Sequence, residues 1–280
     1  MNDSVRRRKY INNIILTLSS VSALLGLIFL FWILGILVVK GIDAFNYGIF
    51  IYDGAPPGRE QSGLRHALIG QGILVGAATM LGVPVGLLAG TYLSEYGQNR
   101  RYANFIRDLS DIMMSAPSIV IGAFVYAIVV QPVGHFNGWA GSIALAIMMI
   151  PIILRTTDDM LSLVPQELRE AASALGAPKY KVILHIVFRG AKIGIVTGIL
   201  LSVARIAGET APLLFTSFSS NFFSTDMNEP IASLTVTIFN YATSPYEDWI
   251  NLGWAAAFIL AMFVLGTNIL GRFIIRKRSP

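Results

Sequence analysis

The sequence predicts an all-helical integral membrane protein with six membrane-spanning helices. Apolar residues make up 54% of the 280 residues and charged residues only 13%, which is roughly half the charged share of a soluble domain. The apolar residues form long blocks near the ~20 residues that a helix needs to cross the hydrocarbon core. The basic residues behind the net charge of +5 cluster at block ends. This is typical of membrane flanks and argues against a nucleic-acid surface.

Six apolar segments are expected to span the membrane. They cover residues 13–39, 66–93, 112–130, 139–154, 193–215 and 252–275. The first is too long for the apolar part of a signal peptide, so we expect it to be retained. The third and fourth are short and contain Pro117 and Pro151, and the fifth contains Arg205 and Glu209.

The orientation follows from the basic residues, which fall on alternate connections. They gather at residues 6–9, 100–107, 155–192 and 276–278, whereas the connection over 226–248 carries only acidic charges. Because basic residues are enriched on the cytoplasmic side, both termini and the two basic loops are predicted to be cytoplasmic.

Two segments carry a glycine at every fourth position, and this spacing places the glycines on one helix face. They are Gly82, Gly86 and Gly90 in the second span, and Gly190, Gly194 and Gly198 entering the fifth. Such faces let helix backbones approach closely. We therefore expect both spans to lie inside a bundle and not against lipid.

Few other residues suggest a site. The chain has no cysteine, which excludes disulfides and cysteine-ligated metals. His66, His135 and His185 are scattered over three segments, so no metal site is predicted. The neighbouring Asp158 and Asp159 are interpreted as a solvated helix end.

The connection over residues 155–189 is long enough to carry structure of its own. A helix is expected to open at residues 162–165, with Pro165 in its first turn, and to end at Gly176 in a left-handed cap, and Pro178 is expected to begin a second helix. Small alanines beside charged residues suit insertion into a groove of another protein, although a solvated surface helix remains an alternative.

Residues 170–176, Glu-Ala-Ala-Ser-Ala-Leu-Gly, resemble the EAA motif of ABC importer permeases, in which a glycine follows six residues after the glutamate. The resemblance implies a type I ABC importer (MetI-like) permease fold. It also implies that Glu170, Ala171, Ala172 and Gly176 contact a groove of an ATPase subunit. The chain departs from the family at residues 186–189, where many members have Ile-x-Leu-Pro. It has no phosphate-binding loop, so a partner would bind the nucleotide.

The charged pair in the fifth span is the strongest candidate site, because either charge costs ~3 kcal/mol in mid-membrane. Arg205 and Glu209 are four residues apart and would share one helix face, so a self-neutralising pair is the alternative. An arginine fork binds phosphate-like oxygens bidentately. Glu209 could accept a hydrogen bond from a protonated oxyanion, which favours phosphate over sulfate.

Residues 204–216 and 224–232 resemble the phosphate-specific transport permeases of the PstA type. The resemblance implies a substrate path that includes Arg205, Glu209 and Thr210. It also implies a bacterial inner membrane, a PstC-like second permease, a PstB-like ATPase dimer that binds ATP and Mg²⁺, and a PstS-like phosphate-binding protein.

The expected layout is a first helix and external loop over 1–64, a transport domain over 65–275 with a coupling hairpin over 155–190, and a cytoplasmic tail over 276–280. We expect no catalytic residue and no cofactor in this chain. Three alternatives stay open: a permease for another oxyanion (sulfate, molybdate or phosphonate), a secondary anion transporter or channel, and a membrane-embedded enzyme.

Overall fold

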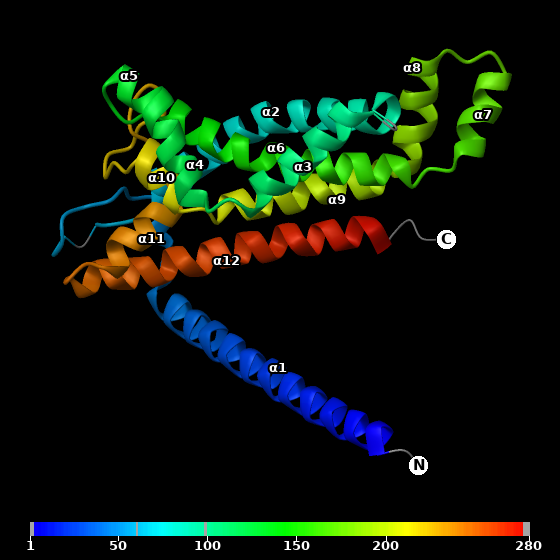
Figure 1. Ribbon diagram of the computed structural model, residues 1–280. Coiled ribbons are helices and arrows are strands. Elements are labelled where there is room, and N and C mark those ends of the chain that lie inside the picture. Colours follow the sequence, from blue (N-terminus) through cyan, green and yellow to red (C-terminus); the bar gives the residue numbers. More distant parts are fainter. Residues whose placement is uncertain (1–2, 60, 98–99, 277–280) are drawn as a thin grey trace.

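The computed structural model describes residues 3–59, 61–97 and 100–276, and in these ranges every regular element is a helix. Figure 1 shows long helices side by side in a bundle, with α1 diverging from it. The predicted all-helical fold is therefore confirmed for the described residues. Of the predicted cytoplasmic tail, residues 277–280 lie outside them.

Five of the described segments are long and apolar enough to cross a membrane. They lie in α1 (Asp3–Ala44), α2 (Arg65–Tyr96), α6 (Gly138–Ser162), the run Lys179–Ala207 and α12 (Glu247–Arg276). The run Lys179–Ala207 comprises α8 (Lys179–Val182), the π-helical η3 (Ile183–Val187) and α9 (Phe188–Ala207). A sixth span results if two bent helical segments, Arg101–Ser115 and Ser118–Val133, are counted as one.

The third predicted segment, residues 112–130, is not one helix. The helix α3 (Arg101–Ser115) ends before Pro117, and α4 (Ser118–Val125) continues at 101° to it, followed by η2 (Tyr126–Val130) and α5 (Gln131–Val133). Ala116, which precedes the proline, has an extended backbone with ψ 136°. The ring of a proline disfavours the helical conformation at the preceding residue, and this explains the break.

The fourth span is longer than predicted, because α6 runs to Ser162 and includes Pro151 without a break. Asp158 therefore lies within a helix, where Arg107 of α3 donates to both of its carboxylate oxygens at 2.6 and 3.2 Å. Its side chain is only 6% exposed. The interpretation of a solvated helix end is therefore wrong for Asp158. Its carboxylate is buried and hydrogen-bonded by Arg107. Asp159 is exposed, 3.5 Å from Arg155.

The helix α6 is the centre of the bundle, and both glycine faces pack on it. A Cβ atom added at Gly86 of α2 would lie 2.7 Å from Ile153 Cβ, and one at Gly90 would lie 2.5 Å from Leu154 O. Such distances are shorter than real Cβ contacts, so the two backbones approach as closely as glycine allows. The predicted placement of this face inside the bundle is confirmed.

The glycine face of α9 meets a different part of α6. A Cβ atom at Gly194 would overlap Met160, and one at Gly198 would overlap Thr156. Within the segment of α6 that could span the membrane, 67% of the residues are buried, more than in the other candidate spans. Close packing on both α2 and α9 accounts for that burial.

The first helix differs from the others because it contacts the bundle only near its C-terminal end. Gly41 faces Phe258 of α12, and the rings of Phe45 and Phe258 lie 6.4 Å apart. None of the residues in the apolar window of α1 is buried within this chain. The short η1 (Tyr47–Phe50) follows it and leads into α2.

The predicted helical hairpin is confirmed, although it is shorter than residues 155–190, and its first helix begins at Gln166 and not within residues 162–165. It consists of α7 (Gln166–Ala174) and α8, which begins after Pro178, and Gly176 between them has φ +81°. In Figure 1 the hairpin stands off the same end of the bundle as the start of α1 and the end of α12. This agrees with the prediction that the hairpin and both termini lie on the same side of the membrane. That this side is the cytoplasmic one remains a prediction.

We predict that Gly90→Ala destabilises the protein by about 1–3 kcal/mol, because the new methyl group meets the backbone of α6. Gly76→Ala in the same helix is the control, since a Cβ atom there has nothing within 4 Å. Thermal unfolding of the two variants in detergent measures the difference. Equal melting temperatures would contradict the close approach of α2 to α6.

Candidate functional site

The fifth span is interrupted at the candidate site. The helix α9 ends at Ala207, Gly208 and Glu209 follow outside any helix, and α10 (Ala211–Thr216) begins after Thr210. The prediction of one helix over 193–215 is therefore wrong. The proline at the start of α10 is tolerated because its missing N–H falls in a first turn, where it would have no helical partner.

The break changes the relation between the two charged residues. Arg205 lies in the last turn of α9 and is exposed, whereas Glu209 is half-buried beyond the end of the helix. In the described part of the chain no ion pair joins them, so the alternative of a self-neutralising pair on a shared helix face is not observed. The cation lies instead at the negative end of the helix dipole, which favours a positive charge.

A glutamine on α2 joins the end of α9 to Leu234, which follows later in the chain. The buried Gln71 donates from Nε2 to the carbonyl of Ala207 at 3.0 Å, and its Oε1 accepts from the backbone N–H of Leu234 at 3.0 Å. Thr235 donates its hydroxyl to the carbonyl of Glu209 at 2.9 Å. Backbone groups freed by a break in a membrane helix must find partners inside the protein, and these two side chains supply them.

The connection between α10 and α12 contains buried structure of its own. The helix α11 (Leu234–Ala242) folds back against α12, and Leu234 and Val236 are buried. Ser217 donates to the carbonyl of Ile231 at 2.7 Å and closes the loop that leads to α11. The start of α11 therefore carries one of the two side chains that bond to the break, Thr235.

The second half of the break rests on α4. A Cβ atom at Gly122 of α4 would lie 2.7 Å from the Cα atom of Pro212 in α10, so the two helices are in close contact. Thr210, at the N-terminal boundary of α10, is half-buried. The structure thus brings Arg205, Glu209 and Thr210 to one broken segment, bounded by α2, α4 and α11.

The EAA residues divide between the two faces of the hairpin. Ala172 is buried against the hairpin's own apolar cluster with Val164 and Val182, whereas Glu170 and Ala171 are exposed. Gly176 forms the turn. The exposed members are therefore free to contact another chain.

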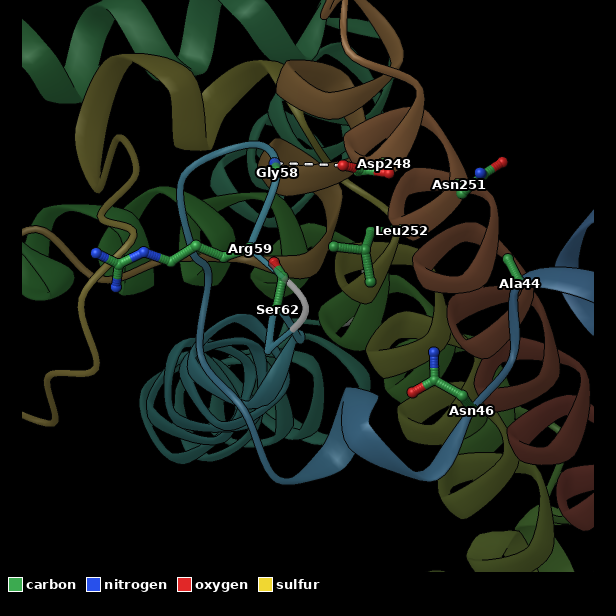
Figure 2. Close-up of a pocket in the computed structure, with 8 residues that line it drawn as sticks. All are labelled: Ala44, Asn46, Gly58, Arg59, Ser62, Asp248, Asn251 and Leu252. Carbon is green, nitrogen blue, oxygen red and sulfur yellow. Dashed lines mark hydrogen bonds between the residues drawn. The ribbon is translucent and has the colours of Figure 1, made fainter.

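A polar hollow of about 320 Å³ lies far along the sequence from the break, where the loop before α2 meets the start of α12 (Figure 2). Gly58 donates its N–H to Asp248 at 3.3 Å across it, and Asn46 and Asn251 also line it. Figure 2 shows the guanidinium of Arg59 pointing away from the hollow. The other charged residue that lines the hollow is Asp248, whose carboxylate would repel an anion.

Among the described residues, no three or more His, Cys, Asp and Glu side chains gather in a way that could hold a metal ion. The buried His66 accepts a hydrogen bond from Gly54 N–H at 3.0 Å through Nδ1, so it has a structural role.

The chain is similar to known transport proteins along most of its length. The family described as binding-protein-dependent transport system inner membrane component matches residues 82–280. The phosphate transport system permease protein PstA of Haemophilus influenzae is 53% identical over 97% of this chain and 96% of the relative. The protein of the same name from Yersinia pestis is 51% identical over 98% and 92%.

A more distant relative is PstA 1 of Mycobacterium tuberculosis, 36% identical over 97% of this chain and 92% of the relative. Among solved structures, a chain of the MetNI methionine ABC transporter in an inward-facing conformation aligns with a TM-score of 0.60. It covers 77% of this chain and 94% of that chain at 18% identity. At that identity the likeness concerns the fold alone.

We predict that Gln71→Leu loosens the break. It removes both hydrogen bonds and leaves Ala207 O and Leu234 N–H without partners, at about 1–3 kcal/mol for each group. Amide hydrogen exchange at Leu234 is expected to rise at least about tenfold while exchange in α6 stays unchanged. Gln61→Leu, at an exposed position, is the control. Unchanged exchange at Leu234 would show that Gln71 does not hold the segment.

Proposed function

The chain belongs to the binding-protein-dependent transport system inner membrane components, and we propose that it forms half of the translocation path of an ATP-driven inorganic phosphate importer. Relatives that carry the name phosphate transport system permease protein PstA cover nearly the whole chain at up to 53% identity. Its localisation is the inner membrane, which agrees with the five or six candidate spans.

The observation that carries the assignment of the path is the exposed arginine at the broken span. In the described residues the guanidinium of Arg205 is in no ion pair with a carboxylate of this chain. A charge retained in a membrane segment without a partner marks a substrate path more often than a structural role. The planar guanidinium can donate two parallel hydrogen bonds to two oxygens of a phosphate.

Glu209 and Thr210 would select the protonation state of the anion. Phosphate near neutral pH keeps at least one P–OH group, which can donate to the carboxylate of Glu209, whereas sulfate has none. The Thr210 hydroxyl can donate to a further phosphate oxygen. Because Glu209 is not held by Arg205, both side chains remain available to the substrate.

The remaining subunits follow from the family. An ABC importer permease works with a second permease and with ATPase subunits, and we propose a PstC-like permease, a PstB-like ATPase dimer and a PstS-like phosphate-binding protein. ATP and Mg²⁺ would bind to the ATPase, and no catalytic step is proposed for this chain. The hairpin would present Glu170, Ala171 and the turn at Gly176 to the ATPase. Ala172 would pack within the hairpin and support this surface.

We propose a five-helix transport domain over 65–275, with α1 and the loop before α2 as a separate N-terminal part. The exposed apolar surface of α1 and its single contact region with α12 support this division.

The competing functions are transport of another oxyanion and secondary anion transport. An arginine alone would accept sulfate or molybdate, so the phosphate proposal depends on Glu209 and on the named relatives. Phosphate flux into liposomes that contain this chain without any ATPase would contradict the ATP-driven function.

We predict that Arg205→Gln abolishes phosphate uptake by the assembled complex, and that Arg205→Lys lowers uptake about tenfold. A lysine keeps the charge but loses one of two charge-assisted hydrogen bonds, each of about 1.5–3 kcal/mol. Radiolabelled phosphate uptake into proteoliposomes measures both variants, and Arg100→Gln in an exposed connection is the control. Full uptake by Arg205→Gln would remove this residue from the path.

We also predict that Glu209→Gln lowers phosphate uptake and reduces discrimination against sulfate. The amide still accepts a hydrogen bond, but it no longer repels a fully ionised oxyanion. Uptake with sulfate as the competitor measures the change. Unchanged uptake together with unchanged discrimination would exclude the proposed role of Glu209.

A further inference from the structure

A buried ion pair joins the hairpin to the end of a membrane helix. Arg169 of α7 donates from Nη2 and Nε to Glu95 Oε1 at 2.9 and 3.3 Å, and Glu95 lies in the last turn of α2. Their side chains are only 13% and 6% exposed. The sequence does not show that the two residues pair, because they are 74 positions apart.

The same guanidinium also caps the central helix. Nη2 donates to the carbonyl of Leu161 at 2.8 Å, and Nη1 donates to the carbonyl of Val164. These carbonyls lie at the C-terminal end of α6, where the last carbonyls of a helix lack helical partners. One arginine therefore connects α2, α6 and α7.

The other arm of the hairpin is attached at the same place. Lys179 at the start of α8 donates from Nζ to the backbone carbonyl of Glu95 at 2.7 Å. Its ammonium group also lies 3.8 Å from the centre of the Tyr96 ring. Both arms of the hairpin are therefore fastened to the last turn of α2.

Stability alone does not explain a buried pair of this kind. The desolvation of two buried charges offsets most of their attraction, and an apolar pair of similar volume is often as stable. What the pair supplies is a directional connection, since the planar fork of arginine fixes the angle between the helices that it joins. A displacement of α7 must then move the ends of α2 and α6 with it.

We propose that the Glu95–Arg169 pair is the joint through which movement of the hairpin enters the membrane bundle. The two are positioning residues that couple ATP hydrolysis to transport, and this inference rests on the proposed function. The path continues inward because α2 lies against α6 along its glycine face, and because Gln71 on the same helix holds the broken fifth span.

The first test measures phosphate uptake per ATP hydrolysed by the reconstituted complex. With Glu95→Gln or Arg169→Lys we expect this ratio to fall by roughly fivefold or more, while the ATPase still binds and hydrolyses ATP. Asp53→Asn is the matched control, because it breaks an arginine–carboxylate pair at the opposite end of α2. An unchanged ratio in both variants would overturn the proposal.

A second test separates a lost joint from a misfolded chain. Since the chain has no cysteine, Glu95→Cys with Arg169→Cys places its only two thiols at the joint. We expect the reduced protein to be uncoupled, and a short thiol–thiol cross-linker to restore the ratio in the same preparation. A cross-linked protein as uncoupled as the reduced one would overturn the proposal.

A third measurement does not depend on the substrate. Spin labels at the exposed Leu88 of α2 and Leu175 of the hairpin turn report the distance between the two parts. We expect a narrow distance distribution in the native chain and a broad one in Glu95→Gln; equal widths would overturn the joint. If the native complex did not take up phosphate, the proposed function would be contradicted. The distance measurement would still show whether the Glu95–Arg169 pair connects the hairpin to α2.

Discussion

Close packing against α6 is the contact on which the rest of the structure depends. The glycines of α2 and α9 bring both backbones so near to α6 that the added Cβ atoms would overlap its atoms. In a membrane, apolar side chains gain nothing from leaving lipid for protein, so helices associate mainly through such close van der Waals contact. These three helices form the packed framework beside which the break in the fifth span lies.

The break itself depends on hydrogen bonds from outside the interrupted span. A free carbonyl in hydrocarbon costs several kcal/mol, so a chain can leave the helical conformation only where the protein supplies new partners. Gln71 supplies one to Ala207, and Thr235 supplies one to Glu209. The break beside the exposed Arg205 therefore requires buried polar side chains, which come from α2 and from the start of α11.

The charged side chains of the bundle include two groups with different surroundings. Asp158 and Glu95 are buried, and each is held by an arginine that belongs to another helix. Arg205 is exposed and in the described residues has no such partner. The first group connects helices, whereas the second is available to a substrate or to a second subunit.

The sequence by itself determined the features that depend on neighbouring residues. The apolar blocks, the two glycine faces and the hairpin with its turn at Gly176 follow from periodicity and from local backbone preference. Only the tertiary structure decided where the chain breaks within the membrane and which charges are buried. Arg107 is 51 residues from Asp158, and Gln71 is 136 residues from Ala207. A hydropathy pattern contains no information about partners so distant, because only folding brings them together.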